Sequence, residues 1–310
     1  MKMVECHRAG NRYGVGGCPL SAAVMPGVKS RTRLTFMTWI VGRALPWGYA
    51  AALSDIRVTL ADRSEVDCLQ KIYPVGPFIA LGFAGSVAIG FRMVERMRQQ
   101  LGGLKPGQSW KPDVVAELWP EEARKVFARF SKWEQDLTCQ LLMVGADPTR
   151  NNGDGPFAIT YVYRFNSPDF VPQLAGANEI ISIGSGEVVA EYSQELRKLD
   201  ERGGFDFLQM EVGNPGGSAL GLLYLISQKV EATPKPGISH HMHVCVARRG
   251  EILLGNNNQR RGEIRYDKNN LHNIVESSEE DFTMPHVAQS HAEFKRMLRD
   301  RGKALALATC

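Results

Sequence analysis

The feature that most constrains the fold is a series of short apolar runs, each ended by turn residues. Residues 35–43 are largely apolar, residues 48–54 are small and apolar throughout, and Pro46 lies between them. Proline has no amide hydrogen for a β-ladder, so we expect a turn at 44–47 between two strands. An apolar run without polar alternation is typical of a strand that is buried on both faces.

Further along, groups of expected strands are followed by pairs of expected helices. After a polar connector at 62–67, the sequence predicts strands at 70–75, 78–83, 138–145, 157–165, 179–183, 241–247 and 251–254. The expected helices occupy 86–101, 113–134, 187–201, 215–231 and 289–303. Strands and helices in groups, without strict alternation, are typical of an α+β fold with antiparallel sheets.

Composition and charge exclude several classes of function. The 310 residues are 44% apolar and 23% charged, which suits one large domain or two small ones with a sizeable core. Residues 1–36 hold six basic side chains and one acidic one, so the rest carries −1 of the total charge of +4. A near-neutral body argues against binding to nucleic acid. No apolar run reaches about 18 residues, so we expect no membrane span.

The six cysteines are scattered through the chain, which suits free thiols in a reducing cytoplasm. Residues 1–37 lack the charged start and apolar core of a convincing signal peptide. We interpret them as a disordered or non-native extension. The expected domain then spans 38–255, and a polar segment with a terminal helix spans 256–310.

Three chemically different side chains occur at the starts or ends of successive expected strands. Asp55 lies seventeen positions after Thr38, and Lys71 lies sixteen positions after Asp55. A threonine hydroxyl is a poor nucleophile unless a base removes its proton. A free α-amine, with a pKa of about 7.7–8.0, is a suitable base at neutral pH. If the working chain begins at Thr38, its own amine is a fourth catalytic group.

Six short motifs occur in the order and spacing of proteasome β-type subunits. They are Met37–Gly42, Leu53–Thr59, Lys71–Ile72, Gly82–Gly85, Val144–Asp147 and Ile181–Gly186. Over about residues 35–255 the chain resembles the bacterial branches of this family, the HslV peptidase and the ancestral β-subunit-like Anbu proteins. The resemblance implies the four-layer αββα sandwich of antiparallel sheets found in N-terminal nucleophile (Ntn) hydrolases.

The same resemblance implies a role for each matched residue. Thr38 is the expected nucleophile, Asp55 and Lys71 are its supports, and Ser185 belongs to the loop near the amine of the nucleophile. The expected substrate-binding residues are Arg57, Thr59, Gly82, Ala84, Gly184 and Gly186. Lys71 would favour deprotonation of the amine and hydroxyl, and Asp55 would keep Lys71 charged. The resemblance implies no metal and no organic cofactor.

The chain departs from the family pattern at two places. The late Asp of the family should fall near Pro236, and no Asp occurs between Thr233 and Ser239. Met37 precedes Thr38, where self-cleaving precursors usually carry Gly. We therefore expect the free amine to arise by initiation at Met37 and removal of that methionine, or by loss of a leader. Ser239 matches a later Ser of the family.

Three functions stay open at this point. The first is a threonine endopeptidase that works through an acyl-enzyme. The second is a catalytically silent scaffold or peptide-binding subunit of proteasome fold. The third is an Ntn amidase or acyl transferase that acts on a small substrate. Ser185 between two glycines also fits a plain helix N-cap, since Ser is favoured there.

The expected partners follow from the first of these functions. They are a peptide or unfolded protein as substrate and further copies of the chain in a ring or spiral. The resemblance leaves an ATPase partner open, and we expect neither nucleic acid nor membrane. His240, His241 and His243 invite a metal site, but no carboxylate or cysteine completes a ligand set at typical spacing. We interpret them as structural or solvent-exposed histidines.

Overall fold

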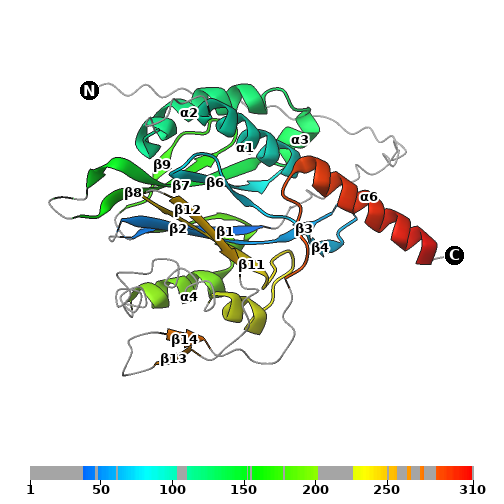
Figure 1. The fold of residues 1–310 in the computed structure, drawn as a ribbon. Helices are drawn as coiled ribbons and strands as arrows, with labels where there is room; N and C mark the ends of the chain where they lie inside the picture. Colours follow the sequence, from blue (N-terminus) through cyan, green and yellow to red (C-terminus); the bar gives the residue numbers. More distant parts are fainter. Residues whose placement is uncertain are drawn as a thin grey trace, which may run out of the picture. The chain divides into compact units, whose positions relative to one another are not determined.

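The computed structural model describes most of the chain from Thr38 onward. The described residues are 38–45, 48–60, 62–102, 110–151, 153, 156–176, 179–201, 226–249, 251–256, 264–266, 273–275 and 284–308. Their fold is α+β, with two five-stranded antiparallel sheets (Figure 1). The expected extension at 1–37 lies outside the described residues.

The first sheet begins directly after Thr38. Its strand order is β10-β1-β2-β11-β12, and each neighbouring pair is antiparallel. The strands are β1 (Trp39–Leu45), β2 (Tyr49–Asp55), β10 (Ile180–Gly184), β11 (Met242–Arg248) and β12 (Glu251–Asn256). β2 is buried throughout, which confirms the prediction of a strand covered on both faces, and β1 is buried almost throughout.

The second sheet has the strand order β5-β6-β7-β8-β9. The strands are β5 (Ile72–Pro74), β6 (Ile79–Gly85), β7 (Cys139–Asn151), β8 (Ala158–Asn166) and β9 (Gln173–Leu174). The strand predicted at 138–145 is longer in the structure, since β7 continues to Asn151 with a register irregularity between Ala146 and Asn151. Within the irregularity, Asp147 accepts hydrogen bonds from the backbone of Thr149 and Arg150.

The polar connector expected at 62–67 is partly a strand. β3 (Arg57–Thr59) and β4 (Glu65–Asp67) form an antiparallel ribbon. Cross-strand ion pairs from Arg57 to Glu65 and Asp67 stabilise it. Because these residues are charged, the sequence does not show the apolar pattern expected of a strand. A second ribbon joins β13 (Ile264–Tyr266) to β14 (Asn273–Val275) within the C-terminal segment.

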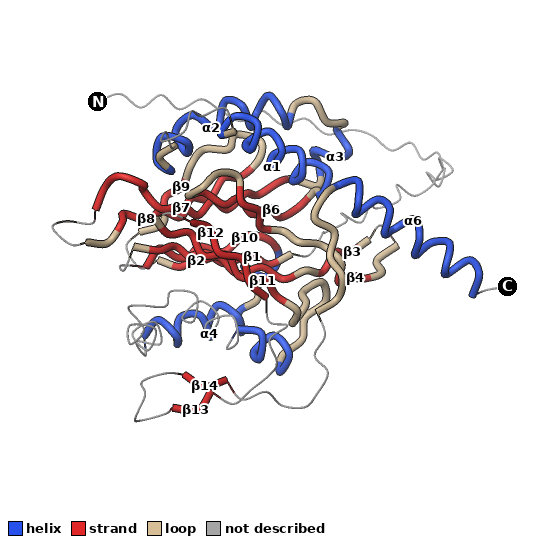
Figure 2. Tube along the Cα trace, viewed as in Figure 1, coloured by secondary structure: helices blue, strands red, loops and turns tan. Residues whose placement is uncertain are grey.

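Three hydrophobic clusters hold the elements together. One lies between the two sheets and includes Ile40, Ile72, Leu142 and Cys245. The second packs α1 (Val87–Leu101) and α2 (Pro112–Phe127) against the second sheet. The third packs the first sheet against α4 (Ala190–Glu201) and the helical residues 226–232. Figure 2 shows α1 and α2 on one side of the paired sheets and α4 on the other.

Two expected helices differ from those observed. The helix predicted at 113–134 ends at Phe127, and a separate short helix, α3 (Lys132–Asp136), follows. Ser131 starts α3 through a capping box with Glu134, a local signal that interrupts the longer helix. The helix predicted at 187–201 divides into a 3₁₀ turn, η1 (Ser185–Val188), and α4. The helix predicted at 215–231 is described only from residue 226.

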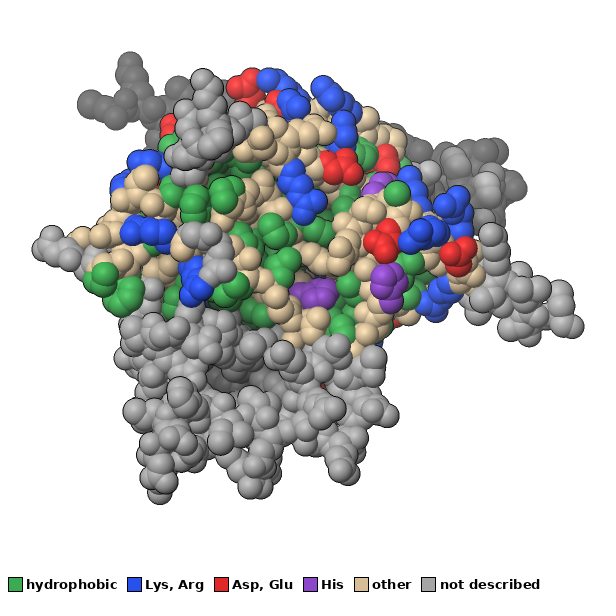
Figure 3. Space-filling view, in the orientation of Figure 1, with side chains coloured by type: hydrophobic (Ala, Val, Ile, Leu, Met, Phe, Trp, Pro, Cys, Tyr) green, Lys and Arg blue, Asp and Glu red, His purple; other side chains and the backbone are tan. Residues whose placement is uncertain are grey.

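The C-terminal part returns to the segment that precedes β5. Ala288 N donates to the carbonyl of Cys68 at 2.8 Å, and Gln70 N donates to the carbonyl of Ala288 at 3.2 Å. α6 (His291–Ala308) follows, and its Phe294 is buried in the cluster beneath α1. In the view of Figure 3, charged side chains of both signs gather over the part of the surface where α6 lies.

Among the helices that the structure describes, none is long and apolar enough to cross a membrane. Cys68, Cys139 and Cys245 are buried free thiols. Burial raises the pKa of Cys68 to about 11 and the pKa of Cys245 to about 12. Both thiols are therefore protonated at neutral pH, and they act as small apolar side chains.

Candidate active site

A buried ion pair forms the centre of the candidate site. Lys71 Nζ lies 2.8 Å from Asp55 Oδ1, and the two side chains are 1% and 0% exposed. Asp55 ends β2 in the first sheet and Lys71 directly precedes β5 in the second, so the pair joins the two sheets. Lys71 Nζ also donates to the carbonyl oxygen of Arg57 at 2.6 Å. The structure thus brings together two of the groups expected to converge.

The carboxylate of Asp55 also fixes the start of β1. Its donors are Trp39 N at 2.8 Å, Lys71 Nζ at 2.8 Å, Arg57 N at 3.0 Å and Ser239 N at 3.4 Å. A fully buried carboxylate needs such partners, since an unpaired one is costly. Because Trp39 directly follows Thr38, the bond from Trp39 N holds Thr38 beside the ion pair. Thr38 itself is 5% exposed.

Burial moves both members of the pair toward their neutral forms. It lowers the pKa of Lys71 and raises the pKa of Asp55, while the attraction between the two charges opposes both shifts. The pKa of Lys71 therefore lies below its ordinary range. A cation here also favours the unprotonated form of any amine placed next to it.

A Gly-Ser-Gly loop closes over Thr38. Thr38 N donates to Ser185 Oγ at 3.0 Å, and Ser185 Oγ donates to Thr38 O at 3.3 Å. Gly184 has φ +85°, and a Cβ there would lie 2.1 Å from Thr38 O. A Cβ on Gly186 would lie 2.2 Å from the ring of Trp39. Both positions need glycine for the loop to come this close.

The position of Ser185 does not fit the N-cap interpretation of its sequence. Gly184, not Ser185, is the N-cap residue of η1. The hydroxyl of Ser185 contacts the backbone of Thr38 on both sides, 147 positions away in the sequence. Ser185 therefore contacts the expected nucleophile and does not cap the following turn.

A second set of charged groups ties residues 237–239 to the β3–β4 ribbon. Ser239 Oγ donates to Asp67 Oδ2 at 2.6 Å, and Gly237 N donates to Glu65 Oε1 at 2.7 Å. Arg57 binds both carboxylates, at 2.7 Å to Asp67 and 3.1 Å to Glu65. Against the effect of burial, hydrogen bonds from Arg57 and Ser239 hold the pKa of Asp67 below its usual value. Asp67 is therefore ionised at neutral pH.

Asp67 gives a carboxylate to the segment that lacks the expected late Asp of the family. Ser239 links this carboxylate to the central pair, because its hydroxyl donates to Asp67 and its backbone N–H donates to Asp55. Sequence reasoning missed Asp67, which lies 172 positions before Ser239. The available signal was Glu65 and Asp67 at alternate positions, which places both carboxylates on one face of a strand.

Two of the expected substrate-binding residues lie on β3. The guanidinium of Arg57 is occupied by Asp67 and Glu65, while its carbonyl accepts the bond from Lys71. The hydroxyl of Thr59 is buried, and it has no hydrogen-bond partner among the residues that the structure describes.

Of the two expected substrate-binding residues on β6, one lies at the Ser185 loop and the other does not. Gly82 lies inside β6 and pairs with Ile72 on one side and Leu142 on the other, so it is surrounded by strands. Ala84 lies two residues nearer the end of β6, and its Cβ is 3.3 Å from where a Cβ on Gly184 would stand. The structure brings Ala84 to the loop and leaves Gly82 within the sheet.

Within the described part of the chain, no group of three or more His, Cys, Asp and Glu side chains could hold a metal ion. The chain matches no model of a known protein family. A search of curated proteins found no similar sequence.

Proposed function

We propose that this chain is a threonine peptidase of proteasome β-subunit type, with Thr38 as the nucleophile once its α-amine is free. The observation that carries the proposal is the buried Asp55–Lys71 pair, whose carboxylate also binds the backbone N–H of Trp39. Through Trp39, the backbone next to Thr38 is thus bonded to a carboxylate that is paired with a cation. The Ser185 hydroxyl, 3.0 Å from Thr38 N, is placed to bind the amine in the same position.

The proposed fold is the four-layer αββα sandwich of Ntn hydrolases. Its support is one apolar cluster between the sheets, with a further cluster between each sheet and its helices. The six sequence motifs supply the second line of support, since all of them fall within residues 37–186.

The free amine of Thr38 acts as the base in the proposed first half-reaction. It accepts the proton of the Thr38 hydroxyl while Oγ1 attacks the carbonyl carbon of the peptide bond. The ammonium then gives this proton to the leaving nitrogen as the C–N bond breaks. An ester on Thr38 Oγ1 and a free amine product result. Before the attack, the positive charge of Lys71 favours the unprotonated form of the Thr38 amine.

Water completes the proposed reaction. The amine of Thr38 takes a proton from a water molecule as the water attacks the ester carbonyl, and it returns a proton to Oγ1 as the ester bond breaks. A carboxylic acid leaves and Thr38 is restored. The backbone at Ala84, beside Gly184, and the hydroxyl of Thr59 are the proposed contacts of the peptide.

Asp67 is the proposed replacement for the late Asp of the family. It acts as a positioning residue, because it holds Ser239, and Ser239 in turn donates its N–H to Asp55. The proposed substrate is a peptide or unfolded protein. The proposed assembly is a homo-oligomer in the cytoplasm, and Leu118 on α2, which is 59% exposed, is one apolar side chain open to a neighbouring copy.

A catalytically silent subunit is the second candidate, and one observation favours it. In the 310-residue chain the nitrogen of Thr38 is acylated by Met37, so it has no basicity. Its N–H donates to Ser185 as a peptide nitrogen. In this form the site can hold a peptide but lacks the base that activates the hydroxyl.

One experiment separates these candidates. The chain is expressed from Met37, its N-terminus is verified as Thr38 by intact mass, and hydrolysis of fluorogenic peptides and of small amides is measured. We expect peptide hydrolysis by this protein and none by its Thr38→Ala variant. Thr38→Ser, which keeps both amine and hydroxyl, is the matched control and should retain activity. A verified Thr38 terminus without hydrolysis of any substrate would favour the silent subunit.

A further inference from the structure

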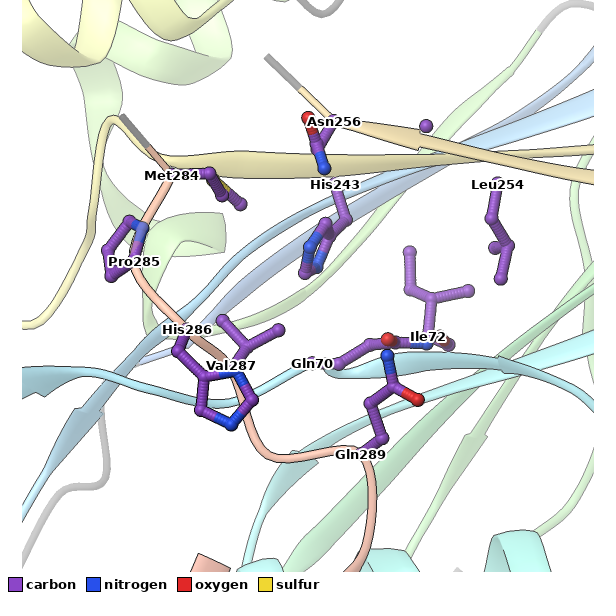
Figure 4. Close-up of a pocket in the computed structure, with 11 residues that line it drawn as sticks. Gln70, Ile72, His243, Leu254, Asn256, Met284, Pro285, His286, Val287 and Gln289 are labelled. Atoms are coloured by element: carbon purple, nitrogen blue, oxygen red, sulfur yellow. Dashed lines mark hydrogen bonds between the residues drawn. The ribbon is translucent and has the colours of Figure 1, made fainter. Parts of the chain in front are cut away.

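A pocket lies at the edge where the two sheets meet, away from the Ser185 loop. Its volume is about 400 Å³. β5 and β12, the outermost strands of their sheets, contribute Ile72 and Leu254, and the segment 284–289 covers them. Figure 4 shows the side chains of these three segments converging, with the ring of His243 from β11 in the middle. We call this space the edge pocket.

His243 gives the edge pocket a polar group that needs a partner. Its Nδ1 atom is buried and makes no hydrogen bond with any residue that the structure describes. Burial, and then the nearby Lys71, lower the pKa of His243 to about 4. The imidazole is therefore neutral at pH 7, with one nitrogen that donates and one that accepts. A ligand in the edge pocket that reaches the imidazole therefore meets a neutral ring able to form a hydrogen bond.

The rest of the lining indicates an uncharged ligand. Among the described lining residues there is no Asp, Glu, Lys or Arg. Gln70 and Gln289 supply amides, which both donate and accept hydrogen bonds. Ile72, Leu254 and Val287 supply an aliphatic surface. A volume near the lower end of the usual range of about 300–1,000 Å³ suits a compact molecule.

We propose that the edge pocket binds a small uncharged amide with an aliphatic group, of the size of a capped amino acid, through a hydrogen bond to His243. Such a ligand matches the neutral imidazole, the side-chain amides and the aliphatic lining together. It could be a residue within a peptide or a free small amide, and the two share this chemistry. The proposal goes beyond the proposed peptidase activity and does not rest on it.

The test uses the full chain carrying Thr38→Ala, so that the candidate nucleophile cannot react with the probe. The probe is N-acetyl-leucine amide, and the signal is the ring resonance of ¹⁵N-labelled His243, assigned with a His243→Gln variant. We expect a saturable shift with a Kd of about 1 mM or below. A signal that stays unchanged up to about 10 mM probe would overturn the proposal.

Two exposed leucines on outer strands give a matched pair of blocking variants. Leu254→Trp puts a large ring into the edge pocket, whereas Leu174→Trp puts the same ring on β9, at the far edge of the second sheet. We expect Leu254→Trp to weaken binding at least about tenfold and Leu174→Trp to leave it unchanged. Equal affinities in both variants would place the probe elsewhere and refute the proposal.

Two further probes define the ligand. N-acetyl-leucine has a carboxylate in place of the amide, and we expect it to bind at least about tenfold more weakly. Equal binding of this acid would contradict an uncharged ligand. A tetrapeptide with a central leucine and capped ends distinguishes the sources. Tighter binding than the single residue supports a peptide ligand, and weaker binding supports a free small amide. Failure of peptide hydrolysis in the unmutated protein changes neither result.

Discussion

Replacing Lys71 with methionine should destabilise the fold strongly, because it leaves Asp55 as a buried carboxylate without its cation. Both side chains are 1% exposed or less, and the N–O distance is 2.8 Å. At an effective dielectric constant near 20, this distance corresponds to an attraction of about 6 kcal/mol. The three backbone donors on Asp55 remain in the variant and recover part of this energy.

We therefore expect Lys71→Met to lower the free energy of unfolding by about 3–5 kcal/mol, the usual result of breaking a buried pair from one side. The assay is urea unfolding followed by circular dichroism, at one protein concentration, since association also changes apparent stability. The double variant Asp55→Asn/Lys71→Met should lose less than the sum of the two single variants.

Lys125→Met is the matched control, because Lys125 also pairs with a carboxylate, at 2.6 Å from Glu121, but on an exposed helix surface. It should leave the stability unchanged. A loss below about 1 kcal/mol for Lys71→Met would refute the reasoning. It would mean that Asp55 is protonated when Lys71 is absent, at little expense to the fold, or that water reaches it.

Three further predictions concern the surroundings of the pair. In thermal unfolding, Gly184→Ala should lower the stability by about 1–3 kcal/mol, and it should remove most of the activity, because its Cβ would meet Thr38 O at 2.1 Å. Gly153 also has a positive φ but has open space around it, so Gly153→Ala should lower the stability by about 1 kcal/mol or less. Asp67→Asn and Ser239→Ala should be coupled by about 1 kcal/mol in a double-mutant cycle, and additive losses would show that their 2.6 Å bond does not matter. Against the effect of burial, bonds from Thr149 and Arg150 lower the pKa of Asp147 to about 2. Its folded pKa lies below the unfolded value of 3.8, so ionised Asp147 stabilises the fold above pH 3.8, and this stabilisation is lost as the pH falls through about 2. It amounts to at most about 2 kcal/mol, because solvent around the 43% exposed Arg150 weakens the interaction. Asp147→Asn should remove that slope from acid unfolding curves.

The sequence predicted those parts of the fold that local pattern controls. β1 and β2 are mostly apolar, and the burial of their apolar residues follows from composition. α1 begins at Val87 because the Oγ atom of Ser86 accepts a bond from Ile89 N, a cap that the residue type announces. In these elements neighbouring residues decide the structure.

The sequence failed where partners distant along the chain decide the structure. β4 is polar, and its strand conformation depends on pairing with β3 through Arg57. α2 ends at Phe127, and the Ser131–Glu134 capping box starts α3. The prediction of one longer helix did not use this local signal. The spacing of apolar residues along one segment does not show which other segment it pairs with or where a cap interrupts it.

The candidate site also has parts that the sequence predicted and parts that it did not. The spacing and the resemblance predicted that Thr38, Asp55 and Lys71 converge. The structure pairs Asp55 with Lys71 and bonds Asp55 to the backbone N–H of Trp39. The contact of Ser185 with Thr38 needed the resemblance, since the Gly-Ser-Gly pattern alone also fitted a cap. The edge pocket gathers Gln70, His243 and Leu254 from three strands, and no local pattern connects them.

The most direct test of the central claim is mass spectrometry of a chain verified to begin at Thr38, after incubation with a peptide epoxyketone. This reagent forms a stable ring only when one residue offers both a hydroxyl and a free amine. We predict a mass increase of one intact inhibitor, with fragment ions that place it on both Oγ1 and N of Thr38, and no adduct on the 310-residue chain. An unmodified Thr38 terminus, or an adduct on another residue, would contradict the account.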